Sequence, residues 1–347
     1  MTSMRLDRKK TEQIERTIFA IVVALLIVSI IFVLVGFDPV QAYASLIWGS
    51  LGTASGLGFT TVQLVPLILT GLASAVAFRG GLWNIGAEGQ LYLGAIAAEL
   101  VGIVAIAPGY LHWPMAIIAG FLGGAAGGCL AGALKAYLKI DEMVSTIMMN
   151  FVFITIVQYL VTGPIKDPQF LAWVKSVAIL PSARIPFGTT TIFALAVAIT
   201  LVIFVLMEKT TFGFEARVLG SNPLAAAYVG VKVKRMTILL MSASGGIAGL
   251  AGAFIVGSIT YWLTDSISRS YGYVGIAVAI LAGLNPLLVI PAALLFAVLF
   301  AGGNVVMANL GMSAQTVALI SAVMIVSFVV SGSLLARIRG VLSRRKT

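Results

Sequence analysis

The sequence has almost none of the side chains on which many enzymes and metal sites depend. Its 347 residues include one cysteine, Cys129, and one histidine, His112. We therefore expect no disulfide, no metal site and no Ser-His-Asp catalysis. The loop sequence Gly-x-x-x-x-Gly-Lys-Ser/Thr is also absent, so the chain lacks the usual means of holding the phosphates of ATP. These absences favour a transport protein that is not itself an enzyme and binds no cofactor.

Charge is scarce as well. Asp, Glu, Lys and Arg make up 10% of the chain, against roughly a quarter in ordinary soluble domains. Hydrophobic residues make up 60%, and the mean hydropathy is +1.08. A helix needs roughly 20 apolar residues to cross a bilayer, and runs of this length recur along the chain, which excludes the weak alternating pattern of a β-barrel. The sequence therefore predicts an all-α fold, a polytopic membrane helical bundle.

Apolar runs between proline, glycine and charged residues predict about ten membrane-spanning helices. We place them at 18–36, 62–78, 88–107, 114–134, 144–162, 189–207, 236–256, 272–287, 289–308 and 315–335. The first follows a basic start, is longer than a signal-peptide core and lacks a clear cleavage site, so we interpret it as a retained span. The boundary between the eighth and ninth is the least defined, because Asn285, Pro286 and Pro291 crowd it.

An even number of spans places both termini on one side of the membrane. If that side is the cytoplasm, it holds 18 of the 22 Lys and Arg residues and the other side holds four. The positive-inside rule therefore predicts cytoplasmic termini. The predicted parts are a cytoplasmic segment 1–17, a transmembrane domain 18–335 with a cytoplasmic loop 208–235, and a basic cytoplasmic tail 336–347. The basic residues are scattered over these cytoplasmic parts, so their expected partner is anionic membrane lipid and not nucleic acid.

Two predicted spans carry glycine at every fourth position, in GFLGGAAGGCLAGALKA from Gly120 and in SGGIAGLAGAF from Ser244. Helices in lipid associate through close backbone contact, which small residues at this spacing allow. The pattern predicts a compact bundle whose helices cross closely.

The stretch FRGGLWNIGAEGQLYLGA, residues 78–95, interrupts the apolar pattern. Four glycines, from Gly80 to Gly89, make a continuous helix unfavourable, since each costs about 1 kcal/mol relative to alanine. Broken backbone near membrane depth is tolerated only against protein or a water-filled cavity. We therefore expect this stretch to border a translocation pathway. The candidate pathway residues, which could stack on a ring or form hydrogen bonds with a solute, are Trp83, Asn84, Glu88, Gln90, Tyr92, Glu99 and Asn150.

The depth of the two carboxylates in this region is open from the sequence. Glu88 and Glu99 share one helix face and are separated by about 16 Å of helix rise. If Glu88 lies near the inner interface, Glu99 lies near the middle of the bilayer, where a charged group is expensive and faces a polar interior. Alternatively the span is shifted, and Glu99 lies near the outer headgroups.

The cytoplasmic stretch TFGFEARVLGSNPLAAAYVGVKVKR, residues 211–235, is the second interruption. Asn222 suits a helix N-cap, Pro223 suits the first helical position, and Gly230 can end a helix of one or two turns. Such a short helix is either a simple connector or a small apolar surface that enters a groove of a partner.

Together these stretches resemble a known family. The run GLWNIGAEGQLYLGA is similar to the signature of ABC importer permeases of the branched-chain amino acid, simple-sugar and nucleoside group. The loop FGFEARVLGSNPLAAAYVGVKV, followed by SGGIAGLAGA, resembles the ATPase-coupling segment of that group. Within the group, NIGAEGQ is most similar to permeases for nucleosides and related simple-sugar systems. Glu99 departs from the pattern, since a small or apolar residue is expected there.

The resemblance implies a permease subunit in a bacterial or archaeal plasma membrane. It would work with ABC ATPase subunits that use ATP, with a second permease that is identical or different, and with an extracytoplasmic substrate-binding protein or lipoprotein. The expected solute is a nucleoside, with ribose-like or galactose-like sugars and riboflavin-like solutes as alternatives. The residues assigned by the resemblance to ATPase coupling are Glu215, Arg217, Gly220, Asn222, Pro223, Leu224, Ala225 and Ala226.

An ion-coupled secondary transporter is the alternative from another class. It would also use broken helices and intramembrane carboxylates. Only Glu99 is a strong carboxylate candidate within a span, no inverted repeat is evident, and the short cytoplasmic helix has a partner only in an ABC transporter. A membrane-embedded enzyme is disfavoured because no paired acid and base is visible.

Overall fold

The computed structural model describes residues 22–106, 108–169, 174–313, 315–320, 322–323 and 326–327. The predicted cytoplasmic segment 1–17, the basic tail 336–347 and most of the last predicted span lie outside these residues. The chain divides into two compact units, one made of residues 1–63 and 294–347 and the other of residues 64–293.

The described residues are helical throughout, apart from loops and one isolated bridge between Lys166 and Ser176. A first helix covers Val22–Leu34. The following elements are α2 (Pro39–Leu51), α3 (Ala54–Arg79), α4 (Ala87–Gly102), α5 (Gly109–Leu138), α6 (Glu142–Thr162), η1 (Pro181–Ala183), α7 (Thr189–Lys209), α8 (Thr211–Ser221), α9 (Pro223–Tyr228), α10 (Val233–Phe254), η2 (Ile255–Thr260), α11 (Tyr271–Leu281) and α12 (Pro286–Leu310).

Within the described residues, six helices are long and apolar enough to cross a membrane, or seven if the bent pair at the start is one span. The six are α3, α5, α6, α7, α10 with η2, and α12. The all-helical prediction is confirmed. The prediction of ten spans is not confirmed, because α4 and α11 are shorter than a full crossing and the last predicted span lies largely outside the described residues.

Helix α2 is absent from the predicted set. The Asp38 carboxylate accepts a hydrogen bond from the Val40 amide at 2.9 Å, and Pro39 occupies the first turn. This N-cap starts a new helix directly after the first one, with a bend of 116° between the two. A helix of 13 residues is too short to be recognised as a span.

Three close-packed helices, α4, α5 and α10, form the core of the larger unit. Gly124 of α5 lies against α10 so closely that a Cβ on it would come within 2.7 Å of the Gly249 Cα. A Cβ on Gly94 of α4 would likewise collide with the backbone of Gly249. The glycine rows therefore bring three backbones together at one place, as the sequence predicts.

Two other elements differ from the expected boundaries. The stretch 211–221, expected as loop, is the helix α8, which buries Gly213, Ala216 and Leu219 on one face. The seventh predicted span continues beyond residue 256 through the π-helix η2 to Thr260. Tertiary packing fixes both, since the sequence of α8 is only weakly apolar and contains two glycines.

Helix α11 corrects the eighth predicted span. It has 11 residues and ends before a turn in which Gly283 and Leu284 have φ angles of +58° and +60°. Helix α12 then begins at Pro286 and includes Pro291 within it. Helix α11 therefore ends six residues before the predicted end at residue 287, and α12 begins three residues before the predicted start at residue 289.

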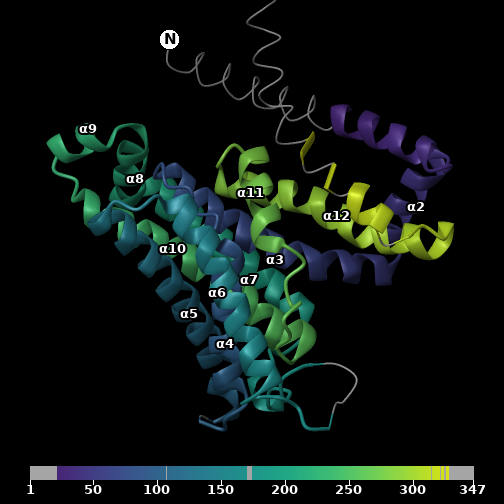
Figure 1. The fold of residues 1–347 in the computed structure, drawn as a ribbon, viewed down its shortest axis with the longest axis horizontal. Coiled ribbons are helices and arrows are strands. Elements are labelled where there is room, and N and C mark those ends of the chain that lie inside the picture. The colour runs from purple at the N-terminus through teal and green to yellow at the C-terminus, as the bar shows by residue number, and fades with distance from the viewer. Residues whose placement is uncertain are drawn as a thin grey trace, which may run out of the picture. The chain divides into compact units, whose positions relative to one another are not determined.

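The two ends of the larger unit carry different structures. Helices α8 and α9 lie at one end, and residues 163–169 and 174–188, called here the loop 163–188, lie at the other (Figure 1). The loop is fixed by backbone hydrogen bonds, from Leu180 to the Gly102 carbonyl at 2.9 Å and from Ile185 to the Gly257 carbonyl at 2.8 Å. The α8–α9 end is the one that the sequence assigns to ATPase coupling.

The helix crossing at Gly249 gives a stability prediction. A Cβ at this position would lie 2.9 Å from the Gly124 Cα, so Gly249→Leu should separate α5 from α10 and destabilise the protein by about 3 kcal/mol, the upper part of the range for overpacking. Thermal unfolding in detergent measures the effect. Gly58→Leu is the matched control, because nothing lies within 4 Å of a Cβ there. Equal unfolding temperatures for the two variants would contradict the predicted crossing.

Candidate translocation and coupling sites

The non-helical segment between α3 and α4, residues 80–86, is held by the buried side chain of Asn84. Its amide nitrogen donates to Gln90 Oε1 and to Ser244 Oγ, both at 2.8 Å, and its Oδ1 accepts from the Gly86 amide at 2.9 Å. Ser244 in turn donates to the Ala73 carbonyl at 2.7 Å. One asparagine thus joins the segment to α4, α10 and α3.

Asn150 of α6 holds the same segment from another side. Its Oδ1 accepts from the Gly89 amide at 2.8 Å, and its amide nitrogen donates to the Ile85 carbonyl at 3.0 Å and to the Tyr273 hydroxyl at 3.1 Å. Asn150 is fully buried. Its polar atoms are therefore engaged by protein groups, and the same holds for Asn84 and the Gln90 amide group.

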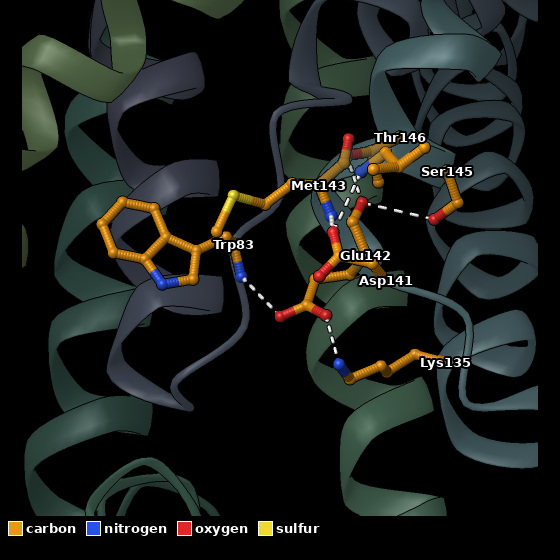
Figure 2. A network of polar contacts seen from close by, with 8 residues as sticks. Trp83, Lys135, Asp141, Glu142, Met143, Ser145 and Thr146 are labelled. Carbon is orange, nitrogen blue, oxygen red and sulfur yellow. Dashed lines mark hydrogen bonds and ion pairs between the residues drawn. The ribbon is translucent and has the colours of Figure 1, made fainter.

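Glu142, at the start of α6, is a site residue that the sequence analysis missed. Its carboxylate lies 2.5 Å from Lys135 Nζ and accepts from the Trp83 amide at 3.5 Å (Figure 2). The Glu142 side chain is buried. The Trp83 indole points away from this carboxylate (Figure 2), packs 4.7 Å from the Phe78 ring between centroids and is 44% exposed. Of the seven candidate pathway residues, Trp83 is the exposed one.

Glu88 and Tyr92 contact the chain before and at the start of α11. The Glu88 carboxylate accepts from the Gly272 amide at 2.7 Å, so it caps the first turn of that helix. Such a carboxylate interacts favourably with the positive end of a helix. The Tyr92 hydroxyl donates to the Asp265 carbonyl at 2.8 Å. Both side chains are buried, and in this chain they position the 264–272 backbone.

Glu99 lies in the last turn of α4, at the end opposite α8 and α9. Its carboxylate accepts a hydrogen bond from Ser176 Oγ in the loop 163–188, and the Leu263 amide donates to the same hydroxyl at 2.8 Å. The side chain is fully buried. The Glu99 carboxylate thus contacts the segment between α6 and α7, and its depth in the bilayer stays a prediction.

The short helix predicted after Asn222 is α9. Asn222 Oδ1 accepts from the amides of Leu224 at 2.9 Å and Ala225 at 3.2 Å, and Pro223 occupies the first turn. Gly230 has a φ of +87° just after the helix. The predicted N-cap, first-turn proline and terminating glycine are therefore confirmed as local structure.

The surface of α9 is apolar and exposed. Leu224 is 73% exposed, Tyr228 92% and Val229 65%, whereas Ala226 is buried. Glu215 of α8 lines a cavity of about 400 Å³ between α8 and α10, together with Lys232 and Arg235. The described part of the chain places nothing over the large side chains of α9.

Arg79 joins α8 to the rest of the unit, which the sequence did not indicate. Arg79 Nη1 lies 2.6 Å from Glu208 Oε1 at the end of α7, and Arg217 of α8 lies 3.6 Å from the other oxygen of Glu208. Arg79 Nε donates to the Leu284 carbonyl at 2.7 Å, in the turn between α11 and α12. Gly220 packs directly on the backbone of residues 79–81. A basic residue before Gly-Gly was the only signal for this role.

Comparison of the sequence with known proteins identifies its family. A family model described as branched-chain amino acid transport system / permease component matches residues 56–329. The nucleoside ABC transporter permease protein NupB of Lactococcus lactis is 32% identical over 91% of this chain and 90% of its own length. The guanosine ABC transporter permease protein NupP of Bacillus subtilis is 33% identical over 94% and 96%. A glucose ABC transporter permease protein of Haloferax volcanii is 30% identical over 90% and 86%.

The broken segment, the close-packed helices and the capped helix α9 thus occur in a multi-pass membrane permease. The chain belongs to the branched-chain amino acid transport system permease family. It is the membrane permease subunit of an ABC importer, which displaces the ion-coupled alternative.

The role of Asn150 as a structural bridge gives a second stability prediction. Asn150→Ala should destabilise the protein by about 2 kcal/mol or more, because the buried Gly89 amide and Ile85 carbonyl lose their partner and each such group costs about 1–3 kcal/mol. Thermal unfolding in detergent checks this. Gln158→Ala, at an exposed position of the same helix, is the control and should change the unfolding temperature little. A variant of Asn150 as stable as this control would show that the segment is held elsewhere.

Proposed function

We propose that this chain forms one half of the translocation pathway of an ATP-driven importer for nucleosides. In this proposal it crosses the membrane about ten times, with both termini and the α8–α9 end in the cytoplasm. The distribution of Lys and Arg residues, 18 against four, supports that orientation. The proposed parts are then a cytoplasmic segment 1–17, a permease domain 18–335 and a cytoplasmic tail 336–347. The coupling loop 208–235 lies within the permease domain.

The exposed apolar surface of α9 is the observation that carries the proposal. A six-residue helix with Leu224 and Tyr228 at 73% and 92% exposure is poorly suited to water. Large aromatic and aliphatic side chains at such a position are typical anchors for a partner groove. In a permease of this family, the partner that has to contact the cytoplasmic end is the ATPase.

The packing of α8 indicates how movement of α9 reaches the pathway. The proposed coupling residues Glu215, Arg217 and Gly220 lie on α8, which Arg79 and Glu208 connect to α3 and to the turn before α12. A displacement of α8 would therefore move the 80–86 segment and one end of α11 together. Such a rigid connection suits alternating access, in which nucleotide binding favours one of two arrangements.

The remaining components follow from this assignment. Two ATPase subunits would bind and hydrolyse ATP, so this chain would need no cofactor of its own and would not be an enzyme. A second permease, identical or different, would complete the pathway, and an extracytoplasmic binding protein would deliver the solute. The complex would reside in a bacterial or archaeal plasma membrane, with the basic tails against anionic lipid.

The nucleoside assignment rests on the two relatives named for nucleoside and guanosine transport, which are 32% and 33% identical. The glucose permease relative, at 30%, keeps a simple sugar as the second candidate. Trp83 is proposed as a ring contact at the inner mouth of the pathway, because its indole is half-exposed and faces away from the carboxylate of Glu142. The six buried candidates are proposed to hold the pathway walls.

The coupling proposal predicts a separation of folding from transport. Leu224→Ser combined with Tyr228→Ser should leave thermal unfolding unchanged but weaken ATPase binding about tenfold or more, since loss of an aromatic anchor costs about 2 kcal/mol. Co-purification with the ATPase and ATP-dependent uptake into vesicles measure this. Phe187→Ser is the control, because Phe187 is 90% exposed at the opposite end. Full uptake in the double variant would contradict the assignment of α9.

The solute proposal predicts a competition pattern. Uptake of labelled guanosine by the complete transporter should require ATP on the ATPase side and persist when the proton gradient is collapsed. Unlabelled nucleosides should compete, whereas ribose and glucose should not, because each lacks the base that the site is proposed to bind. Competition by glucose without competition by nucleosides would transfer the assignment to sugars. Uptake driven by an ion gradient alone would overturn the ABC mechanism.

A further inference from the structure

The stretch between η2 and α11 is a second break in the helices, and its composition is unusual for a membrane protein. Residues 264–270 read TDSISRS, with six polar residues in seven. Ile267, the one apolar residue of this stretch, is buried, with 6% of its surface exposed. Asp265, Ser266, Arg269 and Ser270 are exposed. This is the reverse of the pattern expected for a surface that faces lipid.

The contacts of this stretch run from one end of the unit towards its middle. Leu263 pairs with Ser176 in the loop 163–188, by hydrogen bonds of 3.0 and 2.8 Å. Eight residues later, the Tyr271 carbonyl accepts from Thr70 Oγ1 at 2.8 Å. Thr70 lies nine residues before the end of α3, which is about 14 Å of helix. The contact therefore lies about 14 Å along α3 from Arg79, on whose backbone Gly220 of α8 packs.

Helix α11 follows this stretch. It starts at Tyr271 and runs 11 residues towards the turn that Arg79 holds. The backbone before it is non-helical, and its polar groups are partly satisfied by Tyr92 and Ser268. Non-helical backbone within a membrane-spanning bundle is tolerated only against protein or a water-filled cavity. Exposed ionisable groups within such a bundle normally face a pathway and not lipid.

On the basis of the proposed function, the geometry points to residues 264–270, together with Tyr273, as the wall of the solute pathway that contacts the transported molecule. Asp265 and Arg269 carry opposite charges and sum to zero, which matches an uncharged solute. A carboxylate accepts from neighbouring hydroxyls, and a guanidinium donates to ring acceptors. The 39% exposed ring of Tyr273, whose hydroxyl is fixed by Asn150, offers a face for stacking. The solute class is a neutral molecule with a hydroxyl-rich ring and an aromatic base.

Cysteine accessibility tests this placement in the complete transporter. In a Cys129→Ser background, Ser266→Cys introduces a thiol on the proposed wall, and Thr155→Cys introduces one at an exposed position within α6 as the matched control. A charged, membrane-impermeant methanethiosulfonate reagent reacts with thiolates in water. We expect Ser266→Cys to react and Thr155→Cys to remain unreactive in liposomes. Guanosine at ten times its half-saturating concentration should slow the reaction at Ser266→Cys about tenfold.

Substitution of the charged residue gives a second readout. Asp265→Asn should raise the apparent KM for guanosine about tenfold, because a hydrogen bond to a charged group is lost. Asp167→Asn, in the loop 163–188, is the control and should leave KM unchanged. The ATPase activity of the assembled complex confirms that each variant folds.

These outcomes distinguish a failure of the proposed function from a failure of the proposed pathway wall. Absence of ATP-dependent guanosine uptake in the Cys129→Ser background would overturn the proposed function. Normal uptake combined with an unreactive Ser266→Cys, or with a reaction that guanosine does not slow, would overturn only the placement of the pathway. An unchanged KM in Asp265→Asn would do the same.

Discussion

The structure depends on one constraint: where a helix breaks inside the bundle, its exposed backbone groups need partners from the protein. The 80–86 segment meets this constraint through Asn84 and Asn150, which bond to its amides and carbonyls from two sides. The Glu142 carboxylate adds a partner for the Trp83 amide. Because the polar side chains of this region form hydrogen bonds with other protein groups, their role in this structure is to hold the broken backbone in place. In the proposed function, the break that these side chains stabilise borders the pathway.

The two breaks meet at the start of α11. Glu88, just after the first break, caps the helix that follows the second break, and Tyr92 one turn later holds the Asp265 carbonyl. A carboxylate buried in this way is stabilised by the helix amides that it accepts from. The close approach of α4, α5 and α10 along their glycine rows fixes the position of α4 and hence of both side chains. The packing of α4 against α5 and α10 thereby sets the position of the 264–272 backbone that these two side chains contact.

The α8–α9 end has a different character, because its contacts connect several elements of the larger unit. Arg79 bonds to Glu208 and to the Leu284 carbonyl, and it lies beside the glycine contact between α8 and the 80–86 segment. The same arginine therefore touches the first break and the far end of α11. In the proposed function, a displacement of α9 by a partner would reach both breaks through this residue.

The sequence by itself determined the membrane class, the helical fold, the glycine-mediated packing and the capped helix after Asn222, because hydropathy, residue spacing and capping are local properties. It also located the break at Gly80-Gly81 and gave the family resemblance. It did not determine the short helices α2, α8 and α11, whose ends are set by bends and tertiary contacts. Only the tertiary structure decided which polar residues are occupied: Asn84, Asn150 and Glu88 are engaged by groups from distant parts of the chain, whereas Asp265 and Arg269 are exposed. These partners lie 65 to 184 residues apart, and spacing along the chain carries no record of such proximity.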